Sequence, residues 1–264
     1  MFKKIVLLIV LLSCFACQSL DSNSAPNIIL FFVDDLGWQD TSVPFWDKTT
    51  PLNEKYRTPN MERLWAKGVK FTNAYSTPVC TPTRVSLITG MNAARHRVTN
   101  WTLYPDKKQP MELNHPTLDF PEWNYNGVTT HDKIKQAALA TPLAQIMKDN
   151  GYYTIHAGKA HFGAIGYPAE NPINLGFTVN IAGHSPGAPG SYLGAENFGN
   201  EESKTNIWAV PGLDKYHGKP IFLTQALTQE ALLAVEEPLK DAKPFFLYLS
   251  LYGVHTPLMA NEKY

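Results

Sequence analysis

The sequence predicts an α/β fold in which a mostly parallel central sheet is flanked by helices. Two observations lead to this prediction. Continuous apolar runs of strand length alternate along the chain with amphipathic runs of helix length. Polar residues follow the apolar runs abruptly, as they do where parallel strands of an open α/β sheet end. With 264 residues, 44% of them hydrophobic, the chain is long enough to bury a large core.

The strands and helices can be placed from these patterns. Strands are predicted at residues 27–33, 69–75, 152–157 and 245–251. Thr-Pro pairs at 58–59 and 141–142 each open a predicted helix, and Gly68 and Gly151 end them. The expected inward faces carry Met61, Leu64 and Trp65 in the first helix and Leu143, Ile146 and Met147 in the second. A third helix is predicted near residues 223–239, with Leu223, Leu227, Ala231 and Val235 in register.

A cysteine stands at the start of a further predicted helix. Thr81 is suited to cap this helix, Pro82 to its first position and Gly90 to its end, so Cys80 is expected just before a helix over residues 82–89. The positive end of the helix dipole and the charge of Arg84 would both favour an anion there. The alternative is a half-buried structural cysteine beside a surface arginine.

Charge and the N-terminal segment indicate an exported protein that does not bind nucleic acid. Lys+Arg and Asp+Glu both number 23, so the chain lacks the basic field that nucleic-acid binding needs. Lys3 and Lys4 precede an apolar run at 5–12, which predicts a lipoprotein-type signal peptide over residues 1–17 and a linker over 18–26. The segments ending at Cys14 and Cys17 resemble a lipobox, which favours a lipid-anchored periplasmic or outer-membrane protein of a bacterium. Ordinary cleavage, leaving a soluble periplasmic protein, is the alternative.

The polar residues that follow the predicted strands should meet at one edge of the sheet. They are Asp34 and Asp35, Cys80, Lys159 with His161, and His255. Adjacent carboxylates are hard oxygen ligands that suit Ca²⁺ or Mg²⁺, although an Asp-Asp pair also occurs in turns and helix caps. A lone histidine is commonly a hydrogen-bonded loop residue, and a Gly-Lys pair is commonly a solvated turn. Export leaves Cys80 without an intramolecular disulfide partner, which argues against a structural role.

Two stretches, residues 100–135 and 176–218, have no regular period and read as long loops. Their tryptophans and tyrosines could line a substrate pocket and contact sugar faces, or they could form small cores beneath the loops.

These motifs together resemble the sulfatase family of the alkaline-phosphatase superfamily over nearly the whole chain after the signal. Cys80-Thr81-Pro82-Thr83-Arg84 fits the family's C-x-P-x-R signature. Residues 27–38 resemble its opening strand, and residues 58–61 and 68–75 match its next block. Residues 158–163 resemble its G-K-W-H-x-G block with alanine in place of tryptophan, and residues 255–257 match its H-x-P.

The resemblance implies that a maturation enzyme oxidises Cys80 to formylglycine, whose hydrate attacks the sulfur of a sulfated carbohydrate or aryl sulfate. It implies that Asp34, Asp35 and residue 80 bind Ca²⁺, with Mg²⁺ less suitable, and that Arg84 holds the hydrate. Lys159 would bind a sulfate oxygen, His255 would protonate the leaving alcohol, and His161 would accept the proton as the aldehyde re-forms.

One departure from the family pattern concerns the end of the chain. Family members usually continue to an Asp-Asn pair that completes the calcium site and to a second lysine, whereas this sequence stops at Tyr264. Residues 27–264 are therefore expected to form the N-terminal part of a catalytic domain that is incomplete at its C-terminal end. The alternatives are an inactive or glycan-binding lipoprotein and a phosphatase or phosphodiesterase of the same superfamily.

Overall fold

The computed structural model describes residues 25–108, 116–118, 121–201 and 206–264. The predicted signal peptide, and with it Cys14 and Cys17, lies outside the described residues, as does most of the linker. No helix among the described residues has both the length and the apolar character that crossing a bilayer requires.

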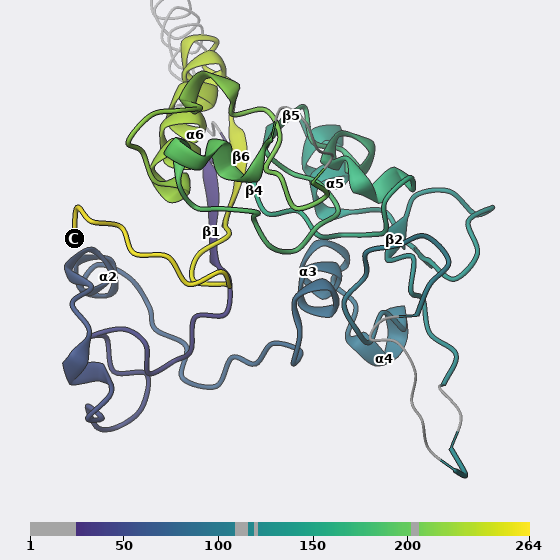
Figure 1. Ribbon diagram of the computed structural model, residues 1–264, viewed down its shortest axis with the longest axis horizontal. Helices are drawn as coiled ribbons and strands as arrows, with labels where there is room; N and C mark the ends of the chain where they lie inside the picture. The colour runs from purple at the N-terminus through teal and green to yellow at the C-terminus, as the bar shows by residue number, and fades with distance from the viewer. Residues whose placement is uncertain (1–24, 109–115, 119–120, 202–205) are drawn as a thin grey trace, which may run out of the picture.

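The predicted α/β fold with a parallel central sheet is confirmed (Figure 1). The sheet contains β1 (Ile28–Val33), β4 (Tyr153–Gly158), β5 (Val179–Ile181) and β6 (Phe245–Leu251). Its strand order is β1-β6-β4-β5, and every neighbouring pair is parallel. Because β6 is central, all seven of its residues are buried, as its continuous apolar run predicts. The short β5 strand lies in a segment that the sequence reads as loop.

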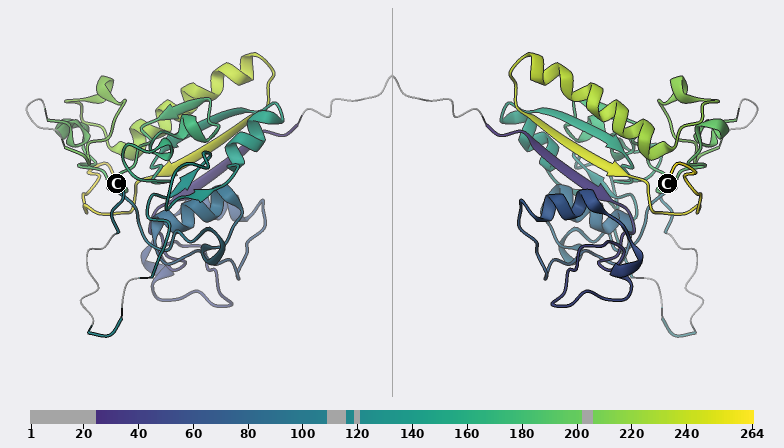
Figure 2. Two further views of the ribbon diagram at one scale, coloured as in Figure 1. Left: turned by 90° about the vertical axis from the view of Figure 1, so that its right-hand side faces the viewer. Right: turned by 90° about the vertical axis from the view of Figure 1, so that its left-hand side faces the viewer.

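Helices cover both faces of the sheet (Figure 2). On one face, α3 (Cys80–Thr89) and α5 (Leu143–Asp149) pack against the sheet through a core that includes Val85, Ile88, Ala144, Phe246 and Tyr248. On the other face, α6 (Leu223–Lys240) packs through Ala231 onto β4 and β6 residues. A third core joins the first half of α6 to the loop segments around Tyr192, Phe198 and Val210.

The remaining elements are short. They are α2 (Pro59–Trp65), α4 (Ala93–His96), the paired strands β2 (Val128–Thr129) and β3 (Ala138–Leu139), and the 3₁₀ helices η1 (Asn53–Lys55), η2 (Pro168–Glu170), η3 (Pro172–Leu175), η4 (Gly194–Gly199) and η5 (Asp214–Tyr216).

Three local predictions are wrong. Residues 69–75 do not form a strand, and the side chains of Val69, Phe71 and Tyr75 are exposed. Helix α2 forms, but none of its residues is buried, so its apolar face has no core to cover. In α5, Ile146 is exposed, and Ala144 is the residue that the core buries. In each case the sequence has the apolar pattern of the predicted element. No other part of the described chain packs against the apolar side chains, so they stay exposed.

The start of α3 also differs from the prediction. The helix begins at Cys80, and the residue at its N-cap is Val79 rather than Thr81. The Thr81 hydroxyl instead accepts a hydrogen bond from the backbone N–H of Thr102, at 3.1 Å. Cys80 is therefore the first residue of the helix, and Gly90 ends it in the left-handed conformation, as expected.

Candidate active site

The carboxyl ends of β1, β6 and β4 lie side by side at one edge of the sheet. Asp34 follows β1 directly, Lys159 follows β4, and His255 lies in the turn after β6. Two backbone hydrogen bonds join the first and last of these segments, from Asp34 N to the Gly253 carbonyl (3.1 Å) and from Val254 N to the Asp34 carbonyl (2.7 Å). Parallel pairing thus brings together residues that lie more than 200 positions apart in the sequence.

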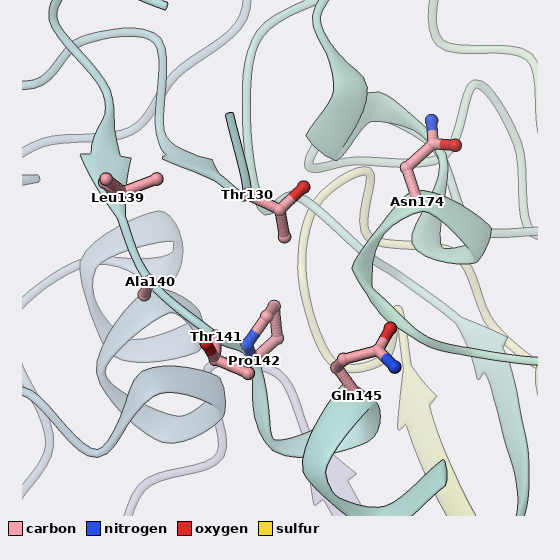
Figure 3. Close-up of a pocket in the computed structure, with 7 residues that line it drawn as sticks. All are labelled: Thr130, Leu139, Ala140, Thr141, Pro142, Gln145 and Asn174. Atoms are coloured by element: carbon pink, nitrogen blue, oxygen red, sulfur yellow. The ribbon is translucent and has the colours of Figure 1, made fainter. Parts of the chain in front are cut away.

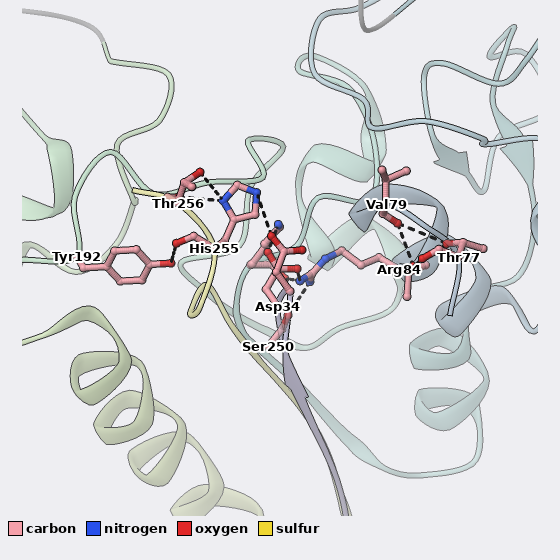
Figure 4. A network of polar contacts seen from close by, with 11 residues as sticks. Asp34, Thr77, Val79, Arg84, Tyr192, Ser250, His255 and Thr256 are labelled. Carbon is pink, nitrogen blue, oxygen red and sulfur yellow. Dashed lines mark hydrogen bonds and ion pairs between the residues drawn. The ribbon is translucent and has the colours of Figure 1, made fainter. Parts of the chain in front are cut away.

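Arg84 connects the three strand ends from the side of α3 (Figure 4). Its guanidinium donates to the Lys159 carbonyl (2.8 Å), to Ser250 Oγ (2.6 Å) and to Asp34 Oδ1 (2.8 Å). The side chain is completely buried, and the guanidinium carbon lies 4.9 Å from the centre of the Phe32 ring. Through these contacts, Arg84 holds the ends of β1, β4 and β6 together. Ser250 was missed from the sequence, although a serine inside the apolar run 245–251 is the signal that could have identified it.

Asp34 is the acceptor shared by two buried cations. Its Oδ1 atom pairs with Arg84, and its Oδ2 atom pairs with the Lys159 ammonium. Burial acts to raise the pKa of Asp34, but the charges of Arg84 and Lys159 outweigh it and hold this pKa below its usual value. Burial and repulsion from Arg84 lower the pKa of Lys159. The cluster therefore places a buried carboxylate under an excess of positive charge.

Asp35 and His255 form the solvent-facing part of the same edge. Asp35 adopts a left-handed backbone conformation with φ 56°, and its side chain is 60% exposed. The Nε2 atom of His255 lies 3.8 Å from Asp35 Oδ2. On the other side of the ring, Nδ1 donates to the Thr256 carbonyl at 2.9 Å, so Nε2 is the ring nitrogen that faces Asp35.

The ligand atoms of Asp34, Asp35 and His255 lie within 4.8 Å of one another, close enough to share one cation. Carboxylate oxygens are the ligands that Ca²⁺ and Mg²⁺ prefer. Asp34 Oδ2 already pairs with one positive group, the Lys159 ammonium. The residues present therefore fit part of the shell of a divalent metal ion.

Tyr192 supports the His255 turn from the 176–218 loop (Figure 4). Its hydroxyl donates to the His255 carbonyl at 2.8 Å, and its ring stacks on Phe222 with 5.2 Å between centroids. Burial raises the pKa of Tyr192 well above its usual value, so the hydroxyl remains a donor. The sequence places Tyr192 only within a long loop and gives no sign of this contact.

His161 lies behind the exposed edge and is fully enclosed. Burial, followed by the charges of Lys159 and Arg84, lowers its pKa well below 6.5, so the ring is neutral. Its Nε2 atom donates to the Thr102 carbonyl at 2.8 Å, whereas no partner is found for the buried Nδ1 atom among the described residues. His161 thus presents a neutral ring with a free acceptor nitrogen.

Cys80 is a free, half-buried cysteine at the start of α3. Burial lowers the pKa of Lys159, while a negative charge on Cys80 acts in the opposite direction, so the two side chains are within electrostatic reach. Thr83 fixes the preceding turn, because its hydroxyl donates to the Val79 carbonyl (2.9 Å) and lies 2.6 Å from Thr77 Oγ1.

A separate pocket lies beside β3 and the start of α5 (Figure 3). It has a volume of about 440 Å³. It is lined by Thr130, Leu139, Ala140, Thr141, Pro142, Gln145 and Asn174. None of the residues predicted for the site lines this pocket, so the strand-end cluster is the stronger candidate for chemistry.

Comparisons with known proteins show the family of the chain. A family model described as Sulfatase matches residues 26–264. A sulfatase of Formosa agariphila is 27% identical over 98% of this chain and 50% of its own length. Mouse N-acetylgalactosamine-6-sulfatase is 27% identical over 97% of this chain and 45% of its own length. The chain therefore spans about half the length of the curated relatives it matches.

Solved structures give the same result for the fold. The crystal structure of Ps i-CgsB superimposes with a TM-score of 0.62 at 25% identity, over 90% of this chain and 47% of that one. A second crystal structure of Ps i-CgsB, in complex with k-i-k-neocarrahexaose, gives a TM-score of 0.59 at 24% identity and covers the same shares of both chains.

Proposed function

Because the chain belongs to the sulfatase family, we propose that its strand-end site hydrolyses sulfate esters. The observation that carries this proposal is the meeting of the Cys80 helix with Asp34, Arg84 and Lys159 at one sheet edge. An anionic sulfate suits this edge, because two buried cations there share a single buried carboxylate.

Cys80 is proposed to act after oxidation to formylglycine by a maturation enzyme, and this modification would supply the hydroxyl that attacks sulfur. Asp34, Asp35 and residue 80 are proposed to hold Ca²⁺, which would offset negative charge on the sulfate. His255 Nε2 is exposed enough to meet a leaving alcohol, and neutral His161 has a free acceptor nitrogen for the proton released when the aldehyde re-forms. Lys159 would contact a sulfate oxygen, and Arg84 would keep the strand ends aligned.

The substrate class is proposed from the relatives. One of them is an N-acetylgalactosamine-6-sulfatase, and Ps i-CgsB was crystallised with an oligosaccharide. We therefore infer a sulfated carbohydrate as substrate, with aryl sulfates as convenient surrogates. The N-terminal pattern of Lys3, Lys4 and the apolar run supports export to the periplasm or outer membrane, with a lipid anchor on Cys14 or Cys17.

The first test is peptide mass spectrometry over Cys80 after expression with a formylglycine-generating enzyme. We expect conversion of the thiol to the aldehyde, and a persistent thiol would contradict the proposal.

Cys80→Ala should remove sulfate release from an aryl sulfate, while the surface variant Lys148→Ala should retain it. Faster hydrolysis of the matching aryl phosphate would instead assign the site to a phosphatase.

Calcium binding can be tested without turnover, by titration calorimetry on protein treated with a chelator. We expect Asp35→Asn to weaken Ca²⁺ binding at least tenfold, because it removes one of the two carboxylates. Asp132→Asn, which changes an exposed aspartate away from the site, should bind like wild type. Equal Ca²⁺ affinities for wild type, Asp35→Asn and Asp132→Asn would show that Asp35 is not a ligand of the metal.

A further inference from the structure

A pocket that the proposed chemistry does not use lies between β3, the start of α5 and η3 (Figure 3). We call it the β3–α5 pocket. Its volume of about 440 Å³ is within the range of pockets that hold small ligands. Leu139 and Pro142 line one side of this pocket, and Gln145 and Asn174 line the other side.

The walls of the β3–α5 pocket are anchored in one core. Ala138, Ala144 and Leu175 are all buried in the core that α3 and α5 share. Each of these three residues is the immediate neighbour in sequence of a residue that lines the pocket. The pocket is therefore formed before a ligand binds, and a ligand does not have to order its walls.

The polar groups that line the β3–α5 pocket are uncharged, and several of their oxygen atoms are free to accept hydrogen bonds. Gln145 Nε2 donates to Asp149 Oδ1 at 2.7 Å, and Asn174 Nδ2 donates to the Pro168 carbonyl at 2.9 Å. Within the described chain, the side-chain oxygens of Gln145, Asn174 and Thr130 have no hydrogen-bond partner. A ligand that satisfies these oxygens must bring hydrogen-bond donors.

The charge of the lining excludes ionic ligands. No residue that lines the pocket is charged, so a sulfate or phosphate group would find no cation there and a divalent metal ion would find no carboxylate. Leu139, which is 57% exposed, and Pro142 instead offer an apolar surface beside the free oxygens.

Hydroxyl donors around an apolar ring face are the combination that a sugar offers. Sugar hydroxyls can donate to the amide and hydroxyl oxygens, while the C–H face of the ring packs on apolar side chains. We propose that the β3–α5 pocket binds an unsulfated sugar unit of a carbohydrate chain, apart from the strand-end site. This proposal goes beyond sulfate ester hydrolysis and does not depend on it, because the pocket contains none of the groups proposed for that reaction.

NMR titration of the 264-residue protein tests the proposal. The probes are N-acetylgalactosamine and an unsulfated galactan hexasaccharide. We expect at least one probe to give saturable shifts of the amide signals of residues 130, 139–141, 145 and 174, while the signals of residues 34, 35 and 159 stay in place. Cys80→Ala should bind the same probe with the same affinity as wild type.

Substitutions in the lining decide whether the pocket is the contact. Thr130→Val removes one hydroxyl at nearly constant shape, and Gln145→Leu removes one amide oxygen. Each should weaken binding about two- to tenfold, since one hydrogen bond to the sugar is lost. Thr141→Trp adds a large ring at an exposed lining position and should abolish binding.

Asp149→Ala is the matched control. It removes the same internal hydrogen bond that Gln145→Leu removes, but it changes no residue that lines the pocket, so it should bind like wild type. The amide spectrum of each variant also shows whether that variant is folded.

Several results would overturn the proposal. They are the absence of shifts with both probes, shifts confined to the strand-end residues, and equal affinities for wild type, Thr130→Val, Gln145→Leu and Thr141→Trp. Loss of binding in Cys80→Ala would place the sugar at the strand-end site instead. Conversion of Cys80 to the aldehyde and sulfate release are measured separately, so failure of sugar binding and failure of the proposed chemistry are distinguishable.

Discussion

Asp34 is the residue on which the geometry of the site depends most. It is 4% exposed and is the carboxylate that pairs with both Arg84 and Lys159, whose side chains are fully buried. A buried cation that loses its counter-charge is strongly destabilising, whereas an exposed ion pair contributes little. The two adjacent aspartates of the motif therefore have different energetic roles, although both are candidate metal ligands.

This difference gives a prediction for the two aspartates. Asp34→Asn should lower the free energy of unfolding by about 3–5 kcal/mol, because two buried cations lose their partner. Asp35→Asn removes an equivalent charge from an exposed side chain and should lower it by less than about 0.5 kcal/mol. Urea denaturation in the presence of a chelator measures both values without metal binding. Similar losses for the two variants would contradict this account of the cluster.

At the scale of elements, the site depends on the close approach of β4 to β6. Gly158 ends β4 with φ 102°, and a β-carbon at this position would collide with the Ser250 carbonyl. Ser250 is also the residue whose hydroxyl accepts from Arg84. Position 158 therefore requires glycine, because β4 and β6 approach each other closely where they end at the candidate site.

Two glycine-to-alanine substitutions distinguish the cost of backbone strain at positive φ from the cost of a steric clash of the added β-carbon. Gly90 ends α3 with φ 67°, but a β-carbon there would meet no atom within 4 Å, so Gly90→Ala should cost about 1 kcal/mol of unfolding free energy. Gly158→Ala adds a backbone collision to similar strain and should cost at least about 3 kcal/mol. Thermal or urea unfolding gives the comparison. Equal costs would show that β4 and β6 separate easily at Ser250.

The elements also show what the sequence could predict. Strands β1, β4 and β6 and helices α3, α5 and α6 follow from apolar periodicity and from Thr-Pro and Gly signals. Strands β4 and β6 and helices α3 and α6 bury apolar residues in the cores, whereas β1 pairs with β6 although none of its residues is buried. Residues 69–75 carry the same kind of pattern and fail, since strand formation needs a neighbouring edge. The polar cluster followed from the rule for strand ends. Ser250 and Tyr192 could not be found in this way, because their roles depend on contacts between distant segments.

For the whole molecule, folding encloses several histidines together with the charged cluster. His156 on β4 is fully buried between aromatic rings, stacked on Tyr248 at 5.5 Å, and its Nδ1 atom lies 3.2 Å from Asn180 Oδ1. Burial is the main cause that lowers its pKa to about 3, and burial similarly lowers the pKa of His184 to about 4. The interior therefore holds neutral imidazoles that the unfolded chain would protonate in mild acid.

This enclosure predicts how the stability of the whole chain depends on pH. The unfolded chain binds a proton at each histidine below about pH 6.5. Folded His156 does so only near pH 3, so its contribution is complete above pH 6.5 and is lost as the pH falls toward 3. Each such histidine should steepen the loss by about 1.4 kcal/mol per pH unit in this window.

His156→Phe keeps an aromatic ring in the core and removes the titration, so urea denaturation from pH 7 to 4 should give a shallower slope for this variant than for wild type. His131→Phe, which changes an exposed histidine, should keep the wild-type slope. A slope for His156→Phe that matches wild type would mean that water reaches the His156 ring in the folded protein. In that case the layer between β4 and the Phe162, Phe177 and Tyr248 rings would be open to solvent, and the sheet that aligns the strand ends would be held less tightly than these contacts indicate.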